Sequence, residues 1–76
     1  MSEKLPPISA DKLAKILRKL GFEEKRQHGS HMVFEHEDGR VTVVPRHPGQ
    51  EIREGLLDDI IKHEIGMSRK EFLEYL

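Results

Sequence analysis

The first periodic run of hydrophobic residues lies near the amino end of the chain. Its members follow the i, i+3, i+4, i+7 spacing that gathers side chains on one face of an α-helix: Leu13, Ile16, Leu17 and Leu20. Ser9 belongs to the residue types that accept hydrogen bonds from the first N–H groups of a helix. Gly21 can end the helix, and Phe22 can fold back on its last turn. We therefore predict a helix over residues 10–20.

Two segments rich in β-branched residues follow, with a turn between them. Residues 30–37 and 40–45 flank Asp38 and Gly39, a pair that favours a two-residue hairpin loop. The preceding segment, residues 22–27, is polar after its first residue, so we expect it to be an edge strand. The three segments together predict a three-stranded antiparallel sheet.

The length of the hairpin loop decides which side chains share a face of the sheet. A two-residue loop pairs Val33 with Val44 and His31 with Arg46. The face against the helices would then carry Met32, Phe34, Val41 and Val43. The open face would carry His31, Val33, Glu35, Thr42, Val44 and Arg46. A three-residue bulged loop is the alternative, and it would shift the pairing.

Two more helices are predicted toward the carboxyl end. A wide apolar stripe that ends before Gly66 marks the first: Leu56, Leu57, Ile60, Ile61 and Ile65. Ser68 and Glu71 have the spacing of a capping box ahead of Phe72, which predicts a short last helix. The element order is α-β-β-β-α with a terminal helix. Helices before and after such a sheet bury their stripes on one of its faces, so we expect a two-layer α+β sandwich whose other face is open.

Length, cysteine content and the amino-terminal residues limit the class of protein. A chain of 76 residues supports one core, so we expect a single domain over residues 1–76. It contains no cysteine, which excludes disulfides and thiolate zinc sites. Pro6 and Pro7 after Lys4 do not resemble a signal peptide, and no apolar run approaches the length of a membrane span. We expect a cytoplasmic protein.

The charge of the chain does not indicate a protein that coats nucleic acid. The formal net charge is −1, whereas such proteins are usually strongly basic. Residues 1–50 hold nine lysines and arginines against seven acidic residues, and residues 51–76 hold four against seven. The acidity therefore lies in the last third of the chain, and any contact with RNA must be local.

Five histidines invite a metal hypothesis, but their spacing does not support one. His31 and His36 would point to opposite faces of one strand, and no cysteine or helical histidine pair joins them. We predict no metal site and no cofactor. We interpret His28, His36 and His63 as solvated surface residues.

His31 has neighbours that suit chemistry on a phosphate. Gly29 allows close approach of the backbone to a ligand, and Ser30 offers a hydroxyl and an amide. Cleavage of RNA through its own 2′-hydroxyl needs a base, an acid and a cation, and an imidazole can transfer protons near neutral pH. Arg46 and His47 would supply the charge and a second proton-transfer group. An exposed strand histidine beside a turn is the alternative interpretation.

Two further surface features have competing interpretations. Lys25, Arg26 and Arg40 could extend a phosphate-binding surface, although the acidic residues around them favour a solvated edge. Val33 and Val44 would face each other on the open side of the sheet, which suggests a surface covered by a partner protein. Ordinary cross-strand packing explains the two valines about as well.

Three ordered segments resemble the HicA family of messenger-RNA interferase toxins. They are residues 17–22, residues 27–31 (Gln-His-Gly-Ser-His) and residues 43–49 (Val-Val-Pro-Arg-His-Pro-Gly), with Gly55-Leu56-Leu57 at the start of a later helix. The resemblance implies a fold like that of double-stranded-RNA-binding domains, with His31 as the single catalytic residue. It also implies cleavage of messenger RNA and neutralisation by a HicB-type antitoxin. A non-catalytic RNA-binding or protein-interaction module on the same fold is the alternative.

Overall fold

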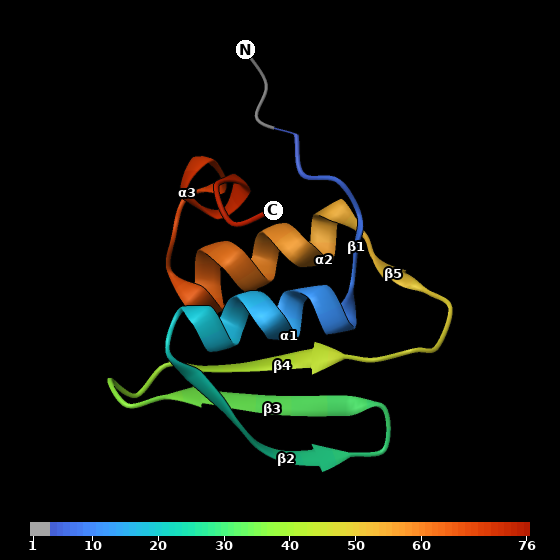
Figure 1. Cartoon of the computed structure of the whole chain (residues 1–76), viewed down its shortest axis with the longest axis vertical. Helices are drawn as coiled ribbons and strands as arrows, with labels where there is room; N and C mark the ends of the chain where they lie inside the picture. The colour runs from blue at the N-terminus through green and yellow to red at the C-terminus, as the bar shows by residue number, and fades with distance from the viewer. Residues whose placement is uncertain (1–3) are drawn as a thin grey trace.

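Three antiparallel strands form the main sheet, and the helices cover one of its faces (Figure 1). The computed structural model describes residues 4–76, so residues 1–3 of the predicted domain lie outside the described residues. The elements are β1 (Ile8–Ser9), α1 (Ala10–Lys19), β2 (Phe22–His28), β3 (His31–His36), β4 (Val41–Pro45), β5 (Glu51–Ile52), α2 (Glu54–Asp59), the π-helix η1 (Ile60–Ile65) and α3 (Arg69–Leu73). The strand order β2-β3-β4 and the flanking helices confirm the predicted α+β sandwich.

The first helix has the predicted ends and the predicted buried face. The Ser9 hydroxyl accepts a hydrogen bond from the Lys12 backbone N–H at 3.0 Å. The helical residues that point to the sheet are buried in the core: Ala10, Leu13, Ala14, Ile16 and Leu17. Gly21 follows with φ of 97°, and a Cβ at this position would lie 2.9 Å from Nε2 of His36. Both the backbone conformation and the space therefore require glycine there.

The second predicted helix is present, but half of it has wider turns than expected. Residues 54–59 are α-helical, and residues 60–65 continue as a π-helix that ends at Gly66. The capping box is confirmed, because the Ser68 side chain accepts from the Glu71 backbone N–H and the Glu71 carboxylate accepts from the Ser68 backbone N–H. Among residues 4–76, no helix is long and apolar enough to cross a membrane.

The predicted register of the β3–β4 hairpin is wrong by one residue. The connecting loop has three residues, 37–39, and the His36 N–H donates to the Arg40 carbonyl at 2.8 Å. Val33 therefore pairs with Val43, and His31 pairs with Pro45. The loop has this length because the Asp38 carboxylate accepts from the Arg40 backbone N–H and Gly39 takes φ of 99°. This is the bulged alternative with glycine at the left-handed position.

The change in register exchanges the two faces of β4. Thr42 and Val44 point to the helices and are fully buried, whereas Val41 and Val43 are exposed on the other face. The buried Thr42 hydroxyl donates a hydrogen bond to the Glu64 carboxylate, so it is not left unsatisfied in the core. A polar residue on the helix-facing side of β4 is thus accommodated by an acid from η1.

A second, two-stranded sheet was not predicted. It pairs Ile8 with Ile52 and Ser9 with Glu51, and it brings the start of α1 next to the segment that leads into α2. Both isoleucines are buried. This short pairing positions the loop between β4 and β5 at the edge of the helical layer (Figure 1).

Candidate functional site

His31 is exposed at one end of the sheet. It is the first residue of β3, directly after the turn formed by Gly29 and Ser30. Met32 and Phe34 are buried against the helices, so the alternation of a strand places His31 on the opposite face. Nothing lies within 4 Å of the position that a Cβ of Gly29 would occupy. A ligand can therefore approach the imidazole and the backbone of the turn together.

A second imidazole lies next to His31. The antiparallel pairing of β2 and β3 places His28 directly opposite His31. Residues paired in this way have Cα atoms about 4.5–5.5 Å apart and side chains on the same face. His28 is exposed, as predicted, but its position beside His31 was missed. The sequence signal was available, since two histidines that flank a two-residue turn in a hairpin must face each other.

Arg46 does not lie opposite His31, so this prediction is wrong. Pro45 takes that position, and the Arg46 backbone N–H donates to the Ser30 carbonyl. The Arg46 side chain reaches helix α1, where its Nε lies 3.4 Å from a carboxylate oxygen of Asp11. The cause is the one-residue shift in register, which turns Arg46 toward the helical layer.

His47 lies beyond β4, in the loop that leads to β5. It is exposed, and together with Pro45 it lines a pocket of about 310 Å³. The β4–β5 loop and the β2–β3 turn lie at the same end of the sheet (Figure 1). This end, which we call the open end, thus carries three exposed histidines: His28, His31 and His47.

Lys25 and Arg26 are exposed on the edge strand β2. Lys25 lies in a bulge of the β2–β3 pairing, with its Nζ 3.5 Å from a carboxylate oxygen of Glu23. Arg26 is paired with Val33, which places it on the face that carries His31. Of the cations predicted for a phosphate-binding surface, Arg26 is therefore the one that lies on the same face of the sheet as His28 and His31.

The predicted surface pairing of Val33 with Val44 is wrong. Val44 is 0% exposed and belongs to the core, because the shifted register turns it toward the helices. The valine opposite Val33 on the open face is Val43, which is 40% exposed, and Val41 is exposed two residues before it. An apolar strip does exist on the open face, but it is formed by the exposed Val41 and Val43 with Val33, which is only 8% exposed, beside them.

His36 is not the solvated residue that we predicted. Its side chain is only 18% exposed, and its ring packs edge-on against Phe22 with centroids 5.1 Å apart. Its Nδ1 accepts from the Asp38 backbone N–H at 3.1 Å. This histidine therefore shapes the β3–β4 turn. His63, by contrast, is exposed on η1, as predicted.

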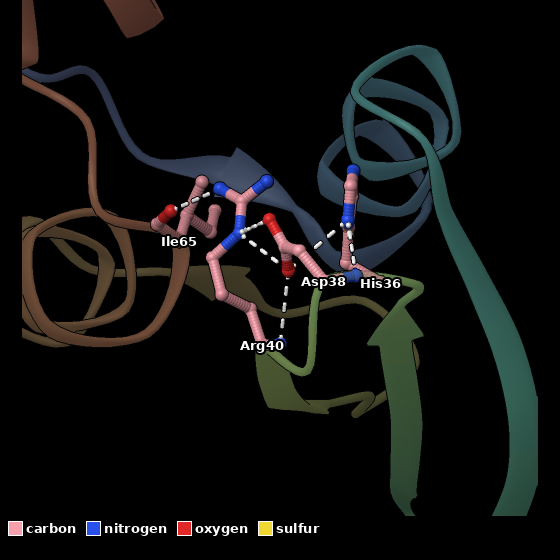
Figure 2. Close-up of polar contacts among 4 residues, drawn as sticks. All are labelled: His36, Asp38, Arg40 and Ile65. Atoms are coloured by element: carbon pink, nitrogen blue, oxygen red, sulfur yellow. Dashed lines mark hydrogen bonds and ion pairs between the residues drawn. The ribbon is translucent and has the colours of Figure 1, made fainter.

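Arg40 connects that turn to the helical layer. Its Nε donates to both carboxylate oxygens of Asp38, and its Nη1 donates to the Ile65 carbonyl at the end of η1 (Figure 2). The backbone N–H of Arg40 and then its guanidinium hold the pKa of the Asp38 carboxyl below its ordinary value. We call the end of the sheet that carries the β3–β4 turn and Arg40 the closed end.

The chemistry available at the open end is proton transfer and phosphate binding. Of two adjacent imidazoles, one can take a proton from a bound substrate as a base while the other gives a proton to it as an acid. Arg26 lies on the same face as the two imidazoles, and Ser30 lies in the turn between them. Among the residues described, no group of three or more histidines and acids is arranged to hold a metal ion.

Comparison with known families identifies the chain. The family model described as the HicA toxin of bacterial toxin–antitoxin systems matches residues 10–65, which include strands β2 to β5 and the turn at His31. No curated protein matches the chain. The match covers well over half of the sequence, and the toxin role implies an antitoxin partner. On this evidence the chain belongs to the HicA toxin family.

Proposed function

We propose that this HicA toxin is an endoribonuclease that cleaves messenger RNA in the cytoplasm with His31 as its catalytic residue. The observation that carries the proposal is the exposed His31 at the open end, beside an unobstructed turn and directly opposite His28. Family membership supports the toxin role, and the pair of imidazoles supports this particular reaction.

The proposed reaction uses the RNA as its own nucleophile. One imidazole removes the proton of a 2′-hydroxyl, whose oxygen attacks the adjacent phosphorus. The bond from phosphorus to the 5′-oxygen breaks, and the second imidazole donates a proton to that oxygen. The products are a 2′,3′-cyclic phosphate and a 5′-hydroxyl, and no metal ion is needed for either proton transfer.

The position of His28 changes the assignment of the second group. Arg46 and His47 were the expected partners of His31, but Arg46 is engaged by Asp11 and His47 lies in the next loop. We therefore assign the second proton transfer to His28. Phosphate contacts are assigned to the Gly29-Ser30 turn, Arg26 and His47 at the same end, with Lys25 as a weaker contact because Glu23 neutralises it.

The antitoxin is proposed to be of the HicB type and to cover the open face. The strip formed by Val33, Val41 and Val43 lies on that face, on the same strands that lead to His31 and the open end. Val41 and Val43 are exposed, and exposed apolar residues that lie together favour a protein contact. A partner bound there would exclude RNA from His31 without needing to touch the imidazole.

Replacement of His31 by alanine tests the proposal. We expect His31→Ala to abolish growth arrest in cells and to lower RNA cleavage by about 10²–10⁴-fold, the usual contribution of a general acid or base. The matched control is His63→Ala, an exposed histidine on the helical layer, which is expected to cleave like the parent. Cleavage is measured by mapping new RNA ends, with and without EDTA.

Three results would contradict the proposal. His31→Ala that cuts as fast as the parent would exclude His31 as the catalyst. Loss of activity in EDTA would exclude the metal-independent reaction. RNA binding without any cleavage product across a range of pH would instead support a non-catalytic RNA-binding module.

A further inference from the structure

A pocket opens between the end of β4 and the start of α2. Its volume is about 310 Å³, and its apolar walls come from Pro45, Ile52 and Leu56. Leu56 is 46% exposed, so its side chain is available to a ligand in the pocket. The rim is polar, with the amide of Gln50 and the guanidinium of Arg53. Ligand-binding pockets have this combination of apolar walls and a few polar groups.

The pocket is adjacent to the proposed catalytic residue. Pro45 lines the pocket and is also the residue directly opposite His31 in the β3–β4 pairing. Paired Cα atoms lie about 4.5–5.5 Å apart and their side chains share a face. His47, two residues further along, lines the pocket as well. An RNA strand bound at His31 therefore has the pocket within the reach of a neighbouring nucleotide.

The lining favours a base over a phosphate. Leu56 and Pro45 offer apolar surface to a heterocycle, and every base has a face that tolerates such contact. Glu51 also lines the pocket. A carboxylate repels a phosphate, whereas it can accept hydrogen bonds from the edge of a base. Arg53 and Gln50 can likewise reach polar atoms of that edge.

We propose that this pocket receives one unpaired base of the RNA next to the cleaved linkage. The inference rests on the proposed function and deepens it, because a base held in a pocket must be free of its pairing partner. The substrate is thus an RNA that is single-stranded at the cleavage site, and the pocket contributes a preference for the base beside that site.

A double-mutant cycle between the protein and the RNA tests the proposal. The protein variants are Leu56→Ser and, as a matched control, Leu76→Ser, since Leu76 is 41% exposed and does not line the pocket. The RNAs are short single-stranded oligonucleotides with one cleavable linkage, either intact or with an abasic nucleotide on one side of it. We measure kcat/KM for each combination.

The expected result is a loss that is not additive. With the parent protein, one abasic position should lower kcat/KM about tenfold, and Leu56→Ser should cause a similar loss on the intact RNA. On the abasic RNA, Leu56→Ser should cause no further loss, because the base that contacts Leu56 is already absent. Leu76→Ser should match the parent on both RNAs.

Other outcomes would overturn the pocket without affecting the proposed nuclease. If Leu56→Ser lowers kcat/KM equally on both RNAs, or on neither, the pocket does not bind a base. The His31→Ala variant still tests catalysis in either case. A Leu56→Ser variant that cleaves normally but loses affinity for the antitoxin would assign the pocket to that protein.

If the parent cleaves neither RNA, the proposed function fails. The same double-mutant cycle, measured as binding affinity for the two RNAs, then tests whether the pocket binds a base.

Discussion

The two ends of the sheet use histidine in opposite ways. At the closed end, His36 is packed against Phe22, accepts a backbone hydrogen bond and joins the contacts of Asp38. At the open end, His28 and His31 face each other in solvent. The same side chain is thus structural where its ring and nitrogen have partners, and available for chemistry where they do not. Whether a histidine of this sheet has a structural or a chemical role therefore depends on its neighbours.

After His31→Ala, the largest expected effect comes from removing the second imidazole of the open end. His28→Ala should lower kcat for RNA cleavage by about 10²-fold, because the remaining imidazole can perform only one of the two proton transfers. Since His28 is exposed, the free energy of unfolding should change by no more than about 0.5 kcal/mol. Single-turnover cleavage and urea unfolding measure the two quantities. Unchanged kcat would return the second role to His47.

An intermediate effect is expected from crowding the closed end. Gly21→Ala places a Cβ 2.9 Å from Nε2 of His36 at φ of 97°, and we expect a loss of about 1–3 kcal/mol in the free energy of unfolding. Gly39→Ala is the matched control, because Gly39 has φ of 99° and nothing within 4 Å of its Cβ position. The difference between the variants measures the His36 contact. Equal losses would show that backbone strain alone is responsible.

The smallest expected effect is a change in acid stability at the closed end. The pKa of Asp38 is lowered in the folded protein, so its contribution to stability is present above the ordinary pKa of 3.8 and is lost as the pH falls through the lower folded value. Asp38→Asn should therefore reduce stability at neutral pH and flatten the decline in acid. Thermal unfolding from about pH 2 to pH 7 measures this. An unchanged acid limb would contradict the role of Arg40.

The sequence predicted those parts of the fold that depend on residues close together in the chain. The cap at Ser9, the apolar face of α1 and the capping box at Ser68 and Glu71 are all confirmed, since each is decided within one or two helical turns. The pairing of β1 with β5 escaped prediction because two-residue strands have no periodicity to detect. The π-helical turns of η1 had no signal that we recognised.

The candidate site was predicted less well than the fold, and one loop explains most of the difference. Asp38 and Gly39 were read as a two-residue loop, whereas the side chains of His36 and Asp38 stabilise a three-residue one. A shift of one residue reverses the faces of a strand. Because of this shift, Arg46 does not lie opposite His31. Val44 is buried, and Val43 is exposed on the open face instead. His31 kept its predicted face because its position depends on β3 rather than on β4.

The outer side of β4 has a consequence for how copies of this molecule can associate. Its outward positions alternate along Val41, Val43 and Pro45, and the Val43 N–H is 3.4 Å from a carboxylate oxygen of Glu64 while proline has no N–H to offer. Among residues 4–76 no strand pairs with the outer side of β2. Fibrous stacking of sheets needs two receptive edges on each subunit. At Val43 and Pro45 the outer side of β4 is therefore less receptive to an added strand than the outer side of β2, which favours a closed pair over a growing filament.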